Sequence, residues 1–152
     1  MTVETDMVDA LVVRFNLFAT AESIDTDIQV QYPGATLKPP QADPPISYFE
    51  LSWVPRPKIH IATHVVRHRG IFGIKVNVPE VDLVDGCNIL IDKLYNHFWP
   101  TDNSGLWLFR NSKTIRIGRG EDTIVSPIDT TTAYNIGGFI TRTAKIFHFC
   151  DT

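Results

Sequence analysis

The chain has 152 residues, of which 43% are hydrophobic and 20% are charged, and its net charge is −3. This composition is typical of one globular domain of ordinary size and excludes a largely disordered chain. The slight acidity argues against a general nucleic-acid-binding protein, because such proteins normally carry a basic excess.

The N-terminal part is predicted to begin with a helix and to continue into a proline-rich arm. Apolar residues recur at helical spacing from Thr5 to Phe18, and Thr5 is the expected N-cap. A short alternating strand is expected at 28–32. Segment 33–45 holds five of the ten prolines, and because proline lacks a backbone donor we expect an exposed arm or loop there.

The middle of the chain is predicted to form three strands and a second helix. Pro55 and Pro57 are expected to close the first strand, and Arg67-His68-Arg69-Gly70 to form the turn before the third. The helix is expected at 81–98, stopped by Pro100. The expected strands are 46–54, 59–66 and 72–78, and the last of these should bury Phe72, Ile74, Val76 and Val78 while Gly73, Lys75 and Asn77 face out.

The C-terminal part is predicted to be mostly antiparallel strand. A hairpin is expected around Asn111-Ser112, a polar loop at 118–129 and a long final strand at 139–149. No repeat or break in composition divides the chain, so we expect a single domain over residues 1–152. The order of elements predicts an α+β fold, with a mostly antiparallel or mixed sheet and two helices packed on one face.

Metal, cofactor and membrane roles find little support in the sequence. His60, His64 and His68 are spaced by four, but on a strand residues four apart lie ~13 Å from each other, which is too far for a shared metal. Cys87 and Cys150 fit no metal spacing and are expected to be reduced thiols, although the sequence leaves a disulfide open. No apolar run approaches the ~20 residues that cross a bilayer, and the acidic start does not resemble a secretory signal.

Catalytic signatures are also missing from the sequence. It contains no nucleophile elbow, no phosphate-binding Walker loop and no zinc-protease motif, so we expect no catalytic residue, no cofactor and no enzyme activity. The segment Thr114–Arg119 resembles a strand and loop of forkhead-associated phosphothreonine-binding domains. Those domains also require Ser-x-x-His, whereas Ser126 is followed by Pro127-Ile128-Asp129.

Charged residues at predicted strand ends and loops are the candidate binding residues. Arginine is the cation favoured at interfaces, so we interpret them as subunit-interface candidates, against the alternative that they serve only solubility. The candidates are Arg67, Arg69, Arg116, Arg119, Glu121 and Asp122.

The strand–turn–strand–helix unit at 58–100 carries a family resemblance. Its Gly70-x-Phe72-x-Ile74-x-Val76 pattern, Pro79 before the helix and Phe98 at the helix end are similar to the tail terminator proteins of long-tailed, lambda-like bacteriophages. The resemblance covers most of the chain, and it is a pattern of apolar positions and lengths.

This resemblance implies a structural virion protein, located in the tail or neck after assembly in the host cytoplasm. Six copies would form a ring on the tail tube, halt its polymerisation and join tail to head. The implied partners are other copies of the chain, the tail tube protein and a head-completion protein, and DNA would pass through the ring without sequence-specific binding. The arm at 33–45 and the loop at 118–129 are the expected docking elements.

Two alternatives stay open. The first is a head-closure or tail-completion connector of the same neck, which shares the small α+β build. The second is a small ligand-binding or enzymatic domain, which would place convergent polar groups in a concave apolar pocket. A ring-forming protein would instead present two separate contact patches.

Overall fold

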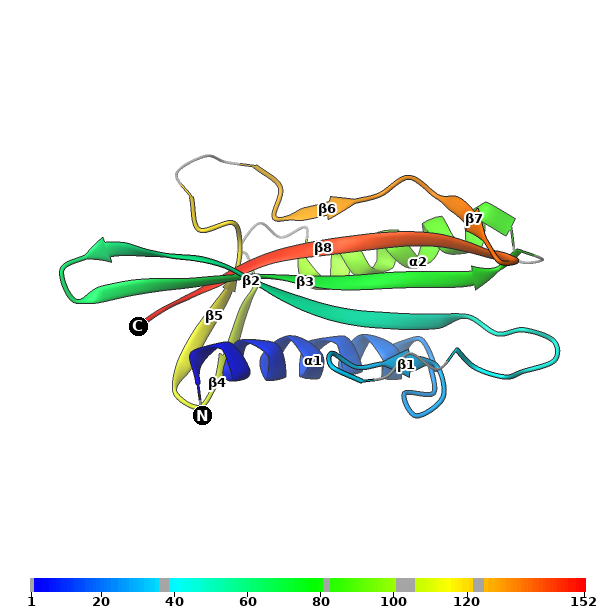
Figure 1. Ribbon diagram of the computed structural model, residues 1–152, viewed down its shortest axis with the longest axis horizontal. Helices are drawn as coiled ribbons and strands as arrows, with labels where there is room; N and C mark the ends of the chain where they lie inside the picture. The colour runs from blue at the N-terminus through cyan, green and yellow to red at the C-terminus, as the bar shows by residue number, and fades with distance from the viewer. Residues whose placement is uncertain (1, 36–38, 81–82, 101–105, 122–124) are drawn as a thin grey trace.

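The computed structural model describes residues 2–35, 39–80, 83–100, 106–121 and 125–152. Two helices lie on the same face of one mixed sheet, which curls around them as a half-barrel (Figure 1). The predicted α+β class, with a mixed sheet and both helices on one face, is confirmed. No helix in the described part of the chain is long and apolar enough to cross a membrane.

The sheet is built around its last strand. Strands β1 to β8 follow the path β1-β2-β3-β8-β5-β4, and β6 and β7 also pair with β8. The contact between β1 and β2 is parallel, and the other pairings are antiparallel. The strands are β1 (Val30–Gln31), β2 (Tyr48–Ala62), β3 (Val65–Pro79), β4 (Trp107–Arg110), β5 (Lys113–Ile117), β6 (Ile128–Thr130), β7 (Tyr134–Ile136) and β8 (Phe139–Asp151), and the helices are α1 (Val3–Ala21) and α2 (Leu83–Phe98).

Helix α1 begins three residues earlier than predicted. Thr2, not Thr5, is the N-cap, because the Thr2 hydroxyl accepts a hydrogen bond from the backbone N–H of Thr5 at 3.1 Å. The helix also buries Asp6, whose carboxylate accepts hydrogen bonds from Lys113 Nζ at 2.6 Å and Asn111 Nδ2 at 2.8 Å. These contacts attach the helix to the β4–β5 hairpin, which turns at Asn111-Ser112 as predicted.

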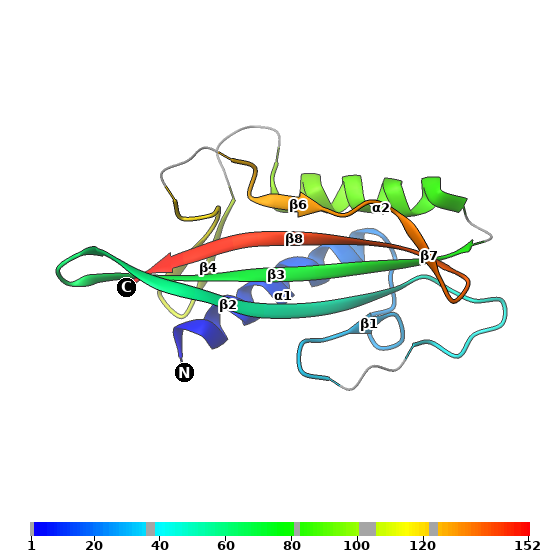
Figure 2. The same ribbon diagram turned by 45° about the horizontal axis from the view of Figure 1, so that its top comes forward.

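The strand that the prolines were expected to end continues through them. β2 runs past Pro55 and Pro57 to Ala62, and the chain turns at Thr63-His64 instead of at 67–70. The strand tolerates proline because β1 covers its outer edge only at Phe49 and Glu50 in the described structure, so a missing N–H there costs no ladder hydrogen bond. Pro57 also falls where the register shifts between Arg56 and Ile59, as in a β-bulge. The long β2–β3 hairpin consequently extends beyond the body of the molecule, close to the C-terminal end of β8 (Figures 1 and 2).

The core lies between the concave face of the sheet and the helices. The side chains of β3 predicted to be buried are so, and Phe72 contacts Phe98 of α2 while Phe15 of α1 contacts Phe49 of β2. On the opposite face Asn77 was expected to point outward, but it is buried and its Oδ1 accepts a hydrogen bond from Thr141 at 2.9 Å.

The remaining predictions concern boundaries. The strand expected at 28–32 is reduced to Val30–Gln31, and the final strand extends two residues further than expected, to Asp151. The described residues of 33–45 form no helix or strand, as expected for the arm. The segment expected to be a loop up to Asp129 contains the start of β6 at Ile128.

Candidate subunit-interface site

The projecting hairpin and the end of β8 position a group of arginines on the sheet face opposite the helices. Side chains alternate between the faces of a strand, and the register places Arg56 opposite Arg69, Arg69 opposite Phe149, and Arg67 opposite Asp151. These residues therefore share one face of the sheet, where the segment from Gly118 to Glu121 folds over them. Arg67 and Arg69, predicted at a turn, lie in a strand.

Arg67 is held in a planar, two-point contact. Its Nε lies 2.8 Å from Asp151 Oδ1 and its Nη2 lies 2.9 Å from Asp151 Oδ2. The guanidinium also stacks 4.3 Å from the ring centroid of Phe149. The hydrogen bond from Arg67 is the main cause that lowers the pKa of Asp151. Both groups are therefore charged at neutral pH.

Glu121 joins two strands of the hairpin. Its Oε1 accepts a hydrogen bond from Arg56 Nη2 and lies 3.4 Å from Arg69 Nη1. These contacts, led by the hydrogen bond from Arg56, lower the pKa of Glu121. Arg69 is more buried, and desolvation, together with the positive charges of Arg56 and Arg67, lowers its pKa. Glu121 therefore offsets the repulsion of guanidinium groups that the strand register brings together.

Arg119 belongs to the same group and reaches β6 and the loop before it. Its Nη2 lies 2.8 Å from Asp129 Oδ1, its Nε donates to the Ser126 carbonyl at 3.0 Å, and its guanidinium stacks 3.8 Å from the centroid of Phe147. Arg56 lies over the same Phe147 ring at 5.2 Å. Two arginines thus share one aromatic side chain.

The group borders a surface recess of about 390 Å³, which combines apolar and charged side chains. Ile61 is 44% exposed there, although it is an aliphatic residue at a hairpin tip. Arginine is enriched at protein–protein interfaces, so a recess that combines arginines with an exposed aliphatic side chain is the candidate site. The recess is lined by Ile59, Ile61, Arg67, Arg69, Gly120 and Glu121; we call it the hairpin recess.

The structure brings together four of the six predicted interface residues. Arg67, Arg69, Arg119 and Glu121 lie in the group just described, whereas Arg116 stacks over Trp107 at 4.3 Å from the ring centroid. Arg116 borders the group, because it pairs with Phe149 across β5 and β8 and its charge helps to lower the pKa of Asp151. Asp122 lies outside the described residues.

Sequence reasoning missed other members of the group. Arg56 was missed because the prolines beside it were expected to end the strand. Phe147 was expected in a strand, but its role under two guanidinium groups depends on a register that the sequence does not show. Asp151 and Asp129 were missed because nothing in the sequence distinguishes them from other isolated acidic residues.

The histidines and cysteines show no sign of a metal site. His60 lies in β2, His64 in the turn and His68 in β3, so the three histidines do not lie along one strand. Cys87 and Cys150 are free and buried, and burial raises the pKa of both thiols. No group of three or more potential ligands gathers anywhere in the part of the chain that the structure describes.

Comparison with known proteins bears on the fold alone. No family model matches the chain, and no curated protein matches it. A solved structure of a protein whose name describes no function is similar over 98% of this chain and 96% of its own, with a TM-score of 0.68 and 17% identity. At this identity the likeness shows a shared α+β fold.

Proposed function

We propose that this protein is a structural virion protein of the tail terminator type, which forms a ring of six copies on the end of a phage tail tube. Its partners in the proposal are other copies of the chain, the tube protein and a head-completion protein, and DNA passes through the ring without sequence-specific binding. The protein would act in the host cytoplasm during assembly and then in the neck of the virion.

The observation that carries this proposal is the presence of two unlike exposed surfaces. One is the hairpin recess, where predicted interface residues line the same cavity as Ile59 and Ile61. The other lies on α1 and β4, where Val13, Leu17 and Phe109 are 51%, 56% and 73% exposed around a groove of about 140 Å³. We call the second surface the helix groove.

A ring of identical subunits needs two different patches that bind each other. Such heterologous contacts place one patch of a subunit against another patch of its neighbour, and they close into a ring when the rotation allows it. The hairpin recess and the helix groove are the two patches that we propose for this contact, because they lie on different elements and opposite sides of the sheet. A catalytic or carrier domain has no comparable need for two exposed apolar surfaces.

The experiment uses one variant in each surface. Ile61→Asp in the hairpin recess and Phe109→Asp in the helix groove should each abolish rings, measured by light scattering and negative-stain microscopy with and without tail tubes. The two variants mixed should form one-to-one dimers, because each retains the patch that the other lacks. Ile89→Ser, at an exposed position of α2 (54%), is the matched control and should leave assembly unchanged.

The outcomes separate this proposal from its alternatives. Rings of wild-type protein on tubes, lost in both variants, support a terminator. Binding to filled heads instead of tubes would identify a head-closure connector of the same neck. Normal assembly by both variants would contradict the proposed ring contacts.

A further inference from the structure

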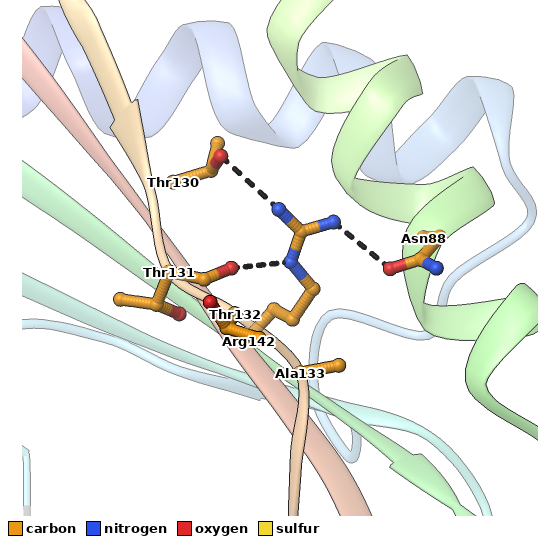
Figure 3. A pocket seen from close by; sticks show the side chains of 6 residues that line it. All are labelled: Asn88, Thr130, Thr131, Thr132, Ala133 and Arg142. Atoms are coloured by element: carbon orange, nitrogen blue, oxygen red, sulfur yellow. Dashed lines mark hydrogen bonds between the residues drawn. The ribbon is translucent and has the colours of Figure 1, made fainter.

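A cavity of about 420 Å³ opens between α2 and the segment that joins β6 to β7. It lies on the concave side of the sheet and is separate from both surfaces described above. Figure 3 shows that the guanidinium of Arg142, from β8, is directed between the helix and the strand. The lining residues are Asn88, Thr130, Thr131, Thr132, Ala133 and Arg142.

Neutral oxygens hold the Arg142 guanidinium in place. Its Nε donates to the Thr131 carbonyl at 2.6 Å, its Nη1 to Asn88 Oδ1 at 2.9 Å and its Nη2 to Thr130 Oγ1 at 3.1 Å (Figure 3). Three contacts in three directions fix the plane of the group before any ligand binds. A site that is ordered in advance loses less conformational entropy on binding.

Some hydrogen-bonding groups in the lining of the cavity are free to bind a ligand. A guanidinium has five N–H groups, and three are used, so two remain for a ligand. Asn88 Oδ1 and Thr130 Oγ1 already accept from Arg142, and Thr131 Oγ1 accepts from the backbone N–H of Thr143 at 2.8 Å. The lining can still donate hydrogen bonds from the Asn88 amide N–H bonds and from the threonine hydroxyls, whose oxygens can also accept them.

Among the described residues no carboxylate forms an ion pair with Arg142. Burial raises the pKa of the nearby Cys87 thiol and outweighs the opposite effect of the Arg142 charge, so this thiol stays neutral. In the part of the chain that the structure describes, this half-buried cation has no carboxylate partner, and it is complementary to an anion that accepts hydrogen bonds.

We propose that this cavity binds a carboxylate group, with Arg142 as its central partner and Asn88 and Thr132 as flanking donors. One guanidinium balances one carboxylate, whereas a phosphate carries about −1.5 to −2 at neutral pH and would leave negative charge uncompensated. The inference is independent of the proposed ring.

Acetate is the probe for this site. Saturable shifts of the backbone amide signals of residues 130–133 are expected in NMR titrations with sodium acetate, but not with sodium chloride at equal ionic strength. Arg142→Gln should abolish the saturable response and Arg142→Lys should weaken it. Thr132→Val keeps every contact that holds Arg142 and should weaken acetate binding several-fold, which retains a test if Arg142→Gln fails to fold.

Several results would overturn the proposal. They are an absence of saturable shifts in the wild-type protein, equal acetate binding by wild type and Thr132→Val, and a saturable response to inorganic phosphate but not to acetate.

Two sources of the carboxylate can be distinguished by sedimentation. If it is an acidic side chain of another copy, excess acetate should shift the wild-type protein, but not Arg142→Lys, toward smaller species. If it is a free metabolite, sedimentation should stay the same, while succinate or glutamate should bind more tightly than acetate.

Discussion

The buried His148 forms a hydrogen bond with the half-buried Trp53 that fixes one protonation state. Trp53 Nε1 donates to His148 Nε2 at 2.8 Å, so Nε2 must be unprotonated. The other ring nitrogen, Nδ1, then carries the hydrogen and donates to the Ile146 carbonyl at 3.1 Å. Burial is the main cause that lowers the pKa of His148 to about 4.

This pair predicts a loss of stability in mild acid. Unfolded histidine has a pKa near 6.5, so between pH 6.5 and 4 the unfolded state binds a proton that the folded state does not. The free energy of unfolding should therefore fall by about 3 kcal/mol from pH 6.5 to pH 4 because of this residue. Urea denaturation over this range measures the slope, which His148→Gln should flatten. An unchanged slope in the variant would contradict the assignment.

Gly70 leaves the space that this pair needs. A Cβ at position 70 would lie 2.7 Å from both His148 Nε2 and Trp53 Nε1. Gly70→Ala should therefore destabilise the protein by roughly 1–3 kcal/mol, as overpacking does, measured by chemical denaturation. Gly73→Ala is the matched control in the same strand, because its Cβ would meet only the Ser52 hydroxyl, which is exposed and can rotate. Equal losses in the two variants would contradict this explanation.

Among the secondary-structure elements, the spacing of apolar residues predicted which strand face is buried. It did not predict where strands end and where the chain turns. The alternation from Phe72 to Val78 identified a buried strand because one of its faces meets both helices. Pro55 and Pro57 misled because proline excludes only a central strand, and the sequence does not show which strand lies at an edge. For the same reason the turn was predicted at Arg67–Gly70, whereas the chain turns at Thr63-His64.

The candidate site was predictable in part for the same reason. Arg67 and Arg69 are two residues apart and therefore lie on the same face of a strand, so their proximity follows from the strand period. Their contacts with Glu121 and Phe149 depend on which strands are neighbours, a long-range property. The site around Arg142 could not be predicted, because the partners of Arg142 come from α2 and β6 and none of them is charged.

The projecting half of the β2–β3 hairpin should be dispensable for folding. Ile59 pairs with Arg67, so residues 60–66 can be replaced by Asn-Gly, a two-residue turn suited to hairpins. The variant should keep the unfolding temperature within a few degrees, measured by circular dichroism, yet lose ring formation because it lacks Ile61. The intact loop with Thr63→Ser is the control. Ring formation by the shortened variant would contradict a role for the hairpin tip.

In the whole molecule β8 holds separate parts of the sheet together. It pairs with β3 along one edge and with β5, β6 and β7 along the other. Its side chains also reach the core through Ile140, Ala144 and Ile146. The fold therefore depends on contacts between residues far apart in sequence, which explains why strand order could not be derived from local patterns.

Truncations test this dependence. Removal of residues 147–152 should abolish cooperative unfolding, because β5 loses its contacts with β8 and His148 is lost with its Trp53 partner. Removal of 151–152 alone breaks the Arg67–Asp151 pair and should only lower the unfolding temperature by a few degrees. Calorimetry distinguishes the two. A cooperative transition in the longer truncation would show that the end of β8 from Phe147 onward is not required.

The position of β8 also has a consequence for synthesis. β2 and β3 leave the ribosome as a hairpin whose open β3 edge has no strand to pair with until Phe139 and the residues after it emerge, sixty residues later than Pro79. At a translation rate of about 5–20 residues per second, this interval lasts several seconds. During that time the nascent chain carries an exposed strand edge, which other copies on the same message could pair with. Folding yield in the cell should therefore depend on chaperones that shield the growing chain.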